Sequence, residues 1–167
     1  MAEPPSAFAR PLSTWLRHLW LDGADSRRQL PAEALQRLEA AVRASEARHL
    51  GELRICVEAG LSLARLWRGQ SPRQRAIECF GLLRVWDTEH NNGVLIYLLL
   101  ADHDVEIVAD RGIHARVGAE AWERVCREME AAFRAGRFEE GALAGIRAVG
   151  VLLAQHFPGT GANEIPD

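Results

Sequence analysis

The sequence predicts an α/β protein, a three-layer α/β/α sandwich on a small mixed sheet. Three segments lead to this prediction. Residues 93–101 (GVLIYLLLA) are continuously apolar, as is typical of a central strand covered on both faces. Residues 52–59 alternate between apolar and polar side chains, which indicates a second strand, and residues 105–109 return as a third. Segments with helical periodicity lie between and after these strands, so helices are expected against the sheet.

The helices follow from local patterns. One is expected from near Pro31 to about Arg48, because apolar residues recur there at helical spacing after a proline in the first turn. Ser71 and Pro72 are a typical N-cap and first-turn pair for another helix. The last two helices are expected at residues 119–135 and 138–156.

Short segments between these elements set the topology. A helix is expected between residues 52–59 and the central strand, so these two strands are expected to be parallel neighbours. Such a helical crossover is right-handed. Asp102 and His103 reverse the chain, so residues 105–109 are expected to run antiparallel to that strand, and Gly112 is expected to end them. No GxGxxG sequence follows a strand, which argues against a dinucleotide-binding domain.

The chain divides into an N-terminal segment, residues 1–29, a domain at residues 30–157 and a flexible tail at residues 158–167. The first segment predicts an amphipathic helix, since Trp15 and Trp20 belong to an apolar stripe at helical spacing. That stripe would pack on the protein's own body. Otherwise it would anchor the chain to a partner's groove or to a membrane surface, although few cations flank it.

Composition excludes several classes of protein. A net charge of −3 argues against a nucleic-acid binder, which would need a surface that neutralises phosphates. The three cysteines form no CxxC pair and are expected to pack as small apolar groups in a reducing compartment. The longest apolar run is far shorter than the roughly 20 residues of a transmembrane helix. Because residues 1–10 also lack the apolar stretch of a secretory signal, a cytoplasmic protein is expected.

A polar cluster stands directly before the central strand. Residues 87–92 (DTEHNN) and Gly93 precede the apolar run, and Asp110 and Arg111 follow the neighbouring strand. A hairpin folds the start of one strand beside the end of the next, so these two groups are expected to meet at one edge of the sheet. Asn91 and Asn92 tolerate positive φ and would form a sharp turn into the strand.

This cluster supplies the oxygen atoms that calcium prefers, which are those of carboxylates, amides and backbone carbonyls. The candidate ligands are Asp87, Glu89, Asn91, Asn92 and Asp110. No D-x-[DN]-x-[DN]-G calcium loop is present, and the alternative is that the asparagines shape the turn while the acids face water. Arg111 could bind a phosphate group with His90 beside it, or it could pair with Asp110 or Glu89 and do nothing more.

A second candidate cluster contains Glu46 and His49. Such a Glu-x-x-His pair occurs in di-iron proteins, but those need two pairs and further glutamates on a bundle. A histidine near the C-terminus of a helix is favoured by the helix dipole in any case. A structural role is therefore expected for His49.

The segment HNNGVLIYLLLADHDVEIVADRGI, followed by a Trp-containing helix and AFRAGRFEEGA, resembles the TPM domain family over residues 30–157. That family includes a thylakoid protein of photosystem II repair and many bacterial proteins. The resemblance implies a Rossmann-like sandwich, calcium binding in some members and acid phosphatase activity in others. Asp110-Arg111-Gly112 stands where the family more usually has a Gly-x-Gly run.

Residues and resemblance together predict a calcium-responsive module that binds a protein partner, in the assembly or repair of protein complexes. The cluster is rich in oxygen ligands and contains no identifiable nucleophile or base, which favours this interpretation. The alternative is a metal-assisted phosphate-ester hydrolase, in which the same oxygens hold the metal and Arg111 holds the substrate.

Overall fold

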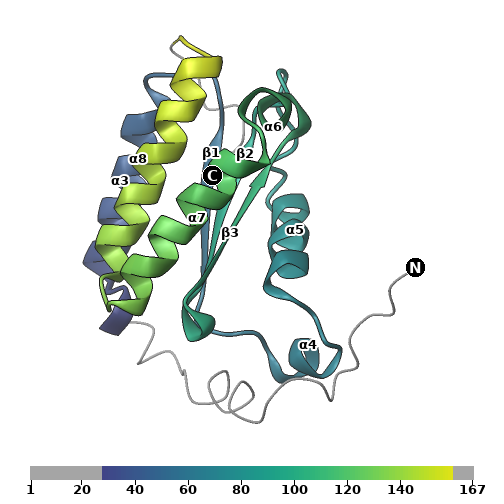
Figure 1. The fold of residues 1–167 in the computed structure, drawn as a ribbon, viewed down its shortest axis with the longest axis vertical. Coiled ribbons are helices and arrows are strands. Elements are labelled where there is room, and N and C mark those ends of the chain that lie inside the picture. Colours follow the sequence, from purple (N-terminus) through teal and green to yellow (C-terminus); the bar gives the residue numbers. More distant parts are fainter. Residues whose placement is uncertain (1–27, 160–167) are drawn as a thin grey trace.

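A computed structural model describes residues 28–159 of the chain (Figure 1). Its elements, in chain order, are α3 (Ala32–Glu46), β1 (Leu53–Glu58), α4 (Leu63–Trp67), α5 (Pro72–Leu82), β2 (Val94–Leu99), the 3-10 helix η2 (Leu100–Asp102), β3 (Asp104–Ala109), α6 (Arg111–Val117), α7 (Ala119–Arg134) and α8 (Phe138–His156). The helix expected around Trp15 and Trp20, and most of the expected tail, lie outside the described residues.

The three strands form one mixed sheet in the order β1-β2-β3. β1 runs parallel to β2 with Leu53 opposite Val94, and the connection between them passes through α4 and α5. β3 runs antiparallel to β2 with Ala109 opposite Val94, after the reversal at η2 and His103, whose φ is 53°. The mixed sheet expected from the sequence is confirmed.

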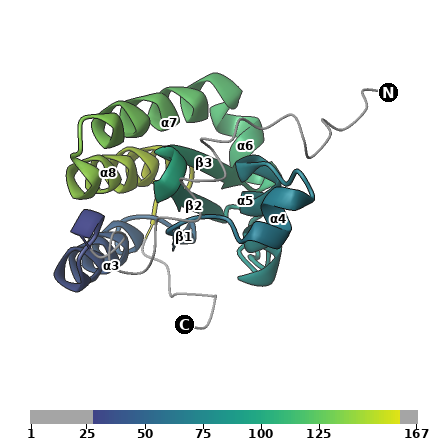
Figure 2. The same ribbon diagram turned by 90° about the horizontal axis from the view of Figure 1, so that it is seen from below.

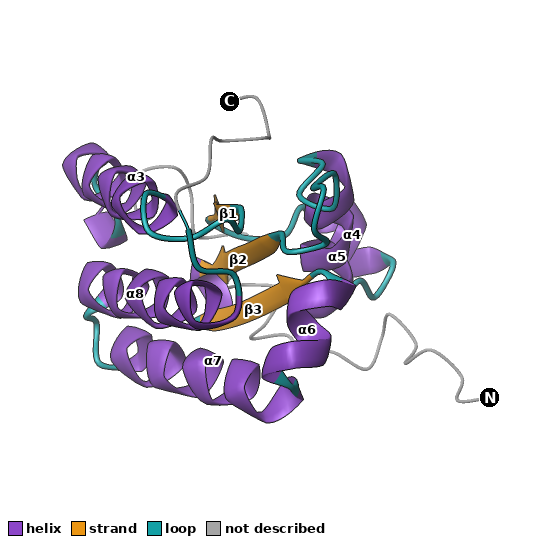
Figure 3. Ribbon diagram, turned by 90° about the horizontal axis from the view of Figure 1, so that it is seen from above, coloured by secondary structure: helices purple, strands orange, loops and turns teal. Residues whose placement is uncertain are grey.

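Helices cover both faces of this sheet, as Figures 2 and 3 show along two opposite directions. α3, α7 and α8 lie on one face, and α4 and α5 lie on the other. All 6 residues of β2 are buried. Its even-numbered side chains join the core under α3, α7 and α8, and its odd-numbered side chains join the core under α4 and α5. This strand is the covered central strand that its uniform apolarity predicts.

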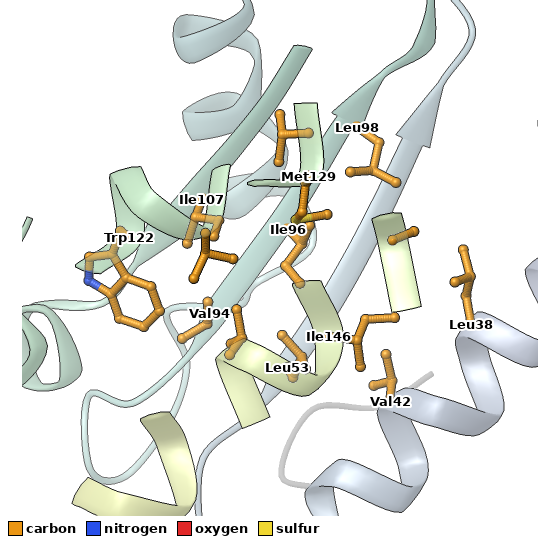
Figure 4. Close-up of a cluster of buried hydrophobic side chains, with 14 of the residues drawn as sticks. Leu38, Val42, Leu53, Val94, Ile96, Leu98, Ile107, Trp122, Met129 and Ile146 are labelled. Carbon is orange, nitrogen blue, oxygen red and sulfur yellow. The ribbon is translucent and has the colours of Figure 1, made fainter. Parts of the chain in front are cut away.

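The larger core lies between the sheet and the three-helix face. Ile96 and Leu98 of β2 point toward Leu38 of α3, Met129 of α7 and Ile146 of α8, as the close-up shows (Figure 4). Each of these side chains is almost completely buried. Burying one such side chain contributes about 1.5–3 kcal/mol relative to leaving it in water, so this core fixes the three helices against the strands.

A capping box begins α5 at the position that the sequence predicts. The Ser71 hydroxyl accepts a hydrogen bond from the Gln74 amide (3.1 Å), and the Gln74 side chain accepts one from the Ser71 amide (2.8 Å). Two of the N–H groups that a helix leaves unpaired at its start are satisfied in this way.

Two helices differ from the sequence-based expectation. Gly112 was expected to end the third strand, and this is wrong. β3 ends at Ala109, and Gly112 lies in the first turn of α6. The helix begins there because Asp110 acts as its N-cap, with Oδ1 accepting a 2.7 Å hydrogen bond from the Arg111 amide. The other helix is α4, whose 5 residues are too few to show a helical period.

A helix that spans a bilayer needs roughly 20 predominantly apolar residues. Between residues 28 and 159, no helix is long and apolar enough to cross a membrane.

Candidate functional site

The loop from α5 to β2 is anchored on the end of α5. Arg84 takes a left-handed conformation with φ 53°, and the next amide, that of Val85, donates a 3.1 Å hydrogen bond back to the carbonyl of Phe80. The Val85 side chain is fully buried in the core under α5. Burial of Val85 fixes the start of the loop, and the polar residues 87–92 extend from this anchor.

The end of the same loop is held by close packing at Gly93. A Cβ atom at this position would lie 1.9 Å from the carbonyl oxygen of Val85, so no other residue fits without moving the backbone. Within the loop, the amide of Asn92 donates a 3.1 Å hydrogen bond to the hydroxyl of Thr88. Both ends of the polar segment are therefore fixed by the fold.

The loop also contacts the start of α6. The amide of Asp110 donates to the carbonyl of Gly93 (2.8 Å), and the amide of Ile113 donates to the carbonyl of Asn91 (3.1 Å). Asn91 itself has a φ of 50°. A Cβ atom on Gly112 would lie 2.5 Å from the carbonyl oxygen of Asn91 and 2.8 Å from that of His90. Glycine at this position thus allows two backbone carbonyl groups to approach the helix.

A hollow of about 730 Å³ lies at this junction and is open to solvent. Its lining consists of Trp86, Asn91, Asp110, Arg111 and Gly112. The hairpin of β2 and β3 brings the loop before β2 and the residues after β3 together, as the sequence predicts. We call this feature the rim hollow.

Asp110 lines the rim hollow, and one of its two carboxylate oxygens has no partner in the described part of the chain. Its Oδ1 caps α6, whereas its Oδ2 is buried without a hydrogen-bond partner among residues 28–159. A buried carboxylate oxygen that lacks a partner is costly, so it favours a cation or a donor brought by a ligand. The neighbouring Arg111 side chain is exposed, and within the described part of the chain its guanidinium group forms no ion pair.

The other predicted ligands do not line the rim hollow. Asn92 is 1% exposed, and its side-chain amide donates a 3.0 Å hydrogen bond to the carbonyl of Leu50. Asp87 forms an ion pair with Arg84. Glu89 and His90 are exposed. Across residues 28–159, no three His, Cys, Asp or Glu side chains are grouped so that they could hold a metal ion. The ligand roles of these residues stay predictions, and Asn92 has an evident structural role.

Sequence reasoning missed Trp86 as a wall of the rim hollow. Its side chain is 52% exposed, which is unusual for so large an apolar group. Its position in the sequence could have indicated this role, because Trp86 stands directly before the polar run and beyond the last turn of α5.

The Glu46 and His49 pair is structural, as expected. His49 is 1% exposed and its two ring nitrogens make hydrogen bonds to Ser45 Oγ (3.0 Å) and to the carbonyl of Gly51 (2.9 Å). Burial lowers the pKa of its imidazole. Glu46 Oε1 accepts a 3.0 Å hydrogen bond from the amide of Leu53, so it joins α3 to β1.

The three cysteines are free thiols that are buried or half-buried. Burial raises the pKa of Cys56 and of Cys126 to about 12 in each case. The reactive thiolate form is therefore scarce at neutral pH. This supports the expected packing role of these residues.

A family model described as the TPM domain matches residues 24–152. The search of curated proteins found no match. Two solution structures are similar in fold. The BA42 protein of the psychrophilic bacterium Bizionia argentinensis is 29% identical, with a TM-score of 0.70 over 82% of this chain and 91% of that chain. The N-terminal domain of a P. gingivalis protein is 18% identical, with a TM-score of 0.64 over 93% of this chain and 96% of that one.

Proposed function

The chain belongs to the TPM domain family, and from this premise we propose that it is a calcium-responsive module that binds a protein partner at the rim hollow. One observation carries the proposal. Asp110 lines the hollow, and its Oδ2 is buried with no hydrogen-bond partner among the described residues. A divalent cation beside this oxygen would compensate the burial of its charge.

The oxygen atoms at the hollow suit a hard cation that also keeps water molecules as ligands. Asp110 supplies a carboxylate oxygen and Asn91 supplies an amide oxygen, and the carbonyl group of His90 lies close to Gly112. Calcium takes about 6–8 oxygens, including water. With one carboxylate at the hollow, several ligand positions would belong to water, and the binding would be weak, in the range of extracellular-type or low-affinity sites.

The link to a partner comes from the surface next to the hollow. Leu82, Leu83 and Trp86 are 68%, 45% and 52% exposed, and they follow one another from the end of α5 into the loop. Exposed apolar groups near one another mark protein contact surfaces. An ion that joins the loop to α6 would hold Trp86 in place for such a contact. The partner class is a client of complex assembly or repair, as the family resemblance implies.

Calcium titration of the full-length chain, with thermal melting as the readout, tests the proposal. Millimolar calcium should raise the melting temperature, because a ligand that binds the folded state alone stabilises it. Asp110→Asn should remove this shift. Asparagine is also a good N-cap, so the variant keeps α6 while it removes the charge.

The matched control is Asp87→Asn, which changes the charge of the same loop at a residue paired with Arg84 and outside the lining of the hollow. This variant should keep the calcium response. A melting temperature that calcium leaves unchanged in the unaltered protein would contradict the proposal, and so would an unchanged response in Asp110→Asn.

A second candidate function, phosphate-ester hydrolysis, is favoured by Arg111. Arg111 lines the rim hollow next to Asp110, and its guanidinium group has no ion-pair partner among residues 28–159. A planar guanidinium group suits two hydrogen bonds to a phosphate. If this second function is correct, the unaltered protein should hydrolyse p-nitrophenyl phosphate. Arg111→Ala should abolish this activity, and Arg84→Ala should keep it. Activity that survives in Arg111→Ala would exclude the second function.

A further inference from the structure

A second hollow, of about 350 Å³, lies along the outer edge of β1, between this strand and α3. Its lining shares no residue with the rim hollow and consists of Leu35, Leu38, Glu39, Val42, Leu53, Arg54, Ile55 and Val57. Within the described residues β1 pairs only with β2, so no strand covers its other side. We call this hollow the edge groove.

The edge groove exposes apolar side chains. Leu35 of α3 is 42% exposed, and Ile55 and Val57 of β1 are half-buried although they pack against the larger core. An edge strand with exposed apolar side chains can pair with other chains, and proteins often prevent this by covering the edge with a helix or a loop. A covering segment is therefore expected at this edge of the sheet.

The chain has a segment that enters the described fold at one end of the edge groove. Glu46, at the end of α3, is hydrogen-bonded to the amide of Leu53, at the start of β1, so the two elements run in opposite directions along the groove. The start of α3, near Leu35, therefore lies beside the end of β1, near Val57. Residues 1–27 lead directly into this start of α3.

Part of this segment has the apolar pattern that the groove requires. Residues 12–20 lie outside the described residues, and their sequence predicts a helix with one apolar face. The side chains of that face are Leu12, Trp15, Leu16, Leu19 and Trp20. Nine residues of helix are about 13 Å long. The strand from Leu53 to Val57 covers the same length, about 13 Å, so the helix and the groove match.

The linker between the apolar segment and α3 is long enough for this placement. Residues 21–27 can span at most about 25 Å when fully extended. A helix at residues 12–20 can therefore lie along the groove with Trp20 at the end near Val57. Its other end, at Leu12, then lies near Val42.

The handedness of the crossovers argues against a strand from residues 1–27 at this edge. β1 crosses to β2 through α4 and α5, which cover one face of the sheet (Figure 2). A strand before α3 would step to β1 in the same direction across the sheet, but over the opposite face. One of the two crossovers would then be left-handed, which is rare. A helix at the edge groove avoids this conflict.

We propose that residues 12–20 form a helix that packs its apolar face into the edge groove and covers the free edge of β1. Trp20 lies against Leu35 and Val57, and Trp15, about 7 Å earlier along the helix, lies against Ile55. The occupant of the groove is thus a segment of the same chain. The inference is independent of calcium binding at the rim hollow.

The experiment uses the full chain with ¹³C-labelled isoleucine δ1 methyl groups. Ile55 reports on the edge groove, and Ile77, which is 52% exposed on α5, reports on the apolar surface of the other face. Ile55→Val and Ile77→Val assign the two resonances. Trp15→Ala should shift the Ile55 methyl resonance, because it removes an aromatic ring from beside that methyl group, and it should leave the Ile77 resonance in place.

Two further variants test the contact. Trp67→Ala is the matched control, because Trp67 is 63% exposed on α4, and this variant should leave the Ile55 resonance unchanged. Leu35→Glu places a charge on the wall of the edge groove and should itself shift the Ile55 resonance. In the Leu35→Glu background, Trp15→Ala should cause no additional shift, because the segment has already left the groove.

Three results would overturn the proposal. The first is an Ile55 resonance that Trp15→Ala leaves unchanged. The second is a shift of Ile77 in place of Ile55, which would place the segment on α5. The third is an effect of Trp15→Ala that is seen only when anionic lipid vesicles are present, which would assign the segment to a membrane surface.

Discussion

The hydroxyl group of Tyr97 donates a 2.6 Å hydrogen bond to the carboxylate of Glu58, which lies on the neighbouring parallel strand. The same carboxylate accepts hydrogen bonds of 3.0 and 3.1 Å from Nε of Arg75 on α5. Burial opposes ionisation of Glu58, but the hydrogen bonds from Arg75 and Tyr97 outweigh it and hold the pKa below its usual value. This contact joins β1, β2 and α5 through one half-buried charge.

Tyr97→Phe should lower the free energy of unfolding by about 2 kcal/mol, the usual contribution of a hydrogen bond to a charged partner. The Tyr97 side chain is fully buried, and phenylalanine keeps the ring, so the change isolates the hydroxyl group. Urea unfolding at neutral pH measures the effect. An unchanged midpoint and slope would show that the hydrogen bond adds nothing to stability.

Asp104→Asn should stabilise the protein at neutral pH and have little effect near pH 4. The pKa of Asp104 is raised to about 6 in the folded state, mainly by burial. The folded state therefore binds more protons than the unfolded state between about pH 4 and 6, and stability falls as the pH rises through this window. Asparagine removes that loss, which is on the order of 2 kcal/mol.

Thermal or urea unfolding at several pH values measures this effect as the difference between the variant and the unaltered protein. Glu120→Gln is the control, because this glutamate is exposed. If Asp104→Asn changed the stability equally at both ends of the pH window, the raised pKa of Asp104 would be contradicted.

Gly93→Ala should destabilise the fold strongly, because its Cβ atom would lie 1.9 Å from the backbone oxygen of Val85. The expected loss is several kcal/mol, as for other forced backbone shifts. Gly81→Ala is the matched comparison, since nothing lies within 4 Å of a Cβ atom there. In α5 it should stabilise by about 0.5–1 kcal/mol. Calorimetry should show a lower melting temperature for Gly93→Ala and a higher one for Gly81→Ala than for the unaltered protein.

The two asparagines of the loop should respond differently to substitution. Asn92→Ala should lower stability by about 1–3 kcal/mol, because it removes the 3.0 Å hydrogen bond to the carbonyl of Leu50, and it should keep the calcium response. Asn91→Gly preserves the positive φ and removes the amide oxygen at the rim hollow, so it should weaken calcium binding. Calcium titrations followed by melting would distinguish the two roles. Equal calcium responses in both variants would disagree with this assignment.

Much of the fold follows from patterns in the sequence. The uniform apolarity of β2 predicts its burial on both faces, and the long periods of α7 and α8 predict these helices almost to the residue. α4 is missed because 5 residues span little more than one turn. α6 is missed because Asp110 and Gly112 were interpreted as a ligand and a strand end, whereas Asp110 caps a helix.

The rim hollow was only partly predictable, for a physical reason. The hairpin requires the segments of Asn91 and Asp110 to meet, because strand pairing places them beside each other. The directions of the side chains depend on loop dihedral angles such as the φ of 50° at Asn91, and no periodicity encodes these. For this reason the inward turn of Asn92 toward Leu50 could not be read from the pattern.

All five lining residues of the rim hollow lie between Trp86 and Gly112, on the arms that flank a single hairpin. One contiguous stretch of the chain therefore contains the whole lining of the hollow, and no distant segment of the described residues contributes to it. A chimera that exchanges this stretch between two homologous domains would transfer all five lining residues in one piece, together with β2 and β3 and the core side chains that these strands turn toward the three-helix face.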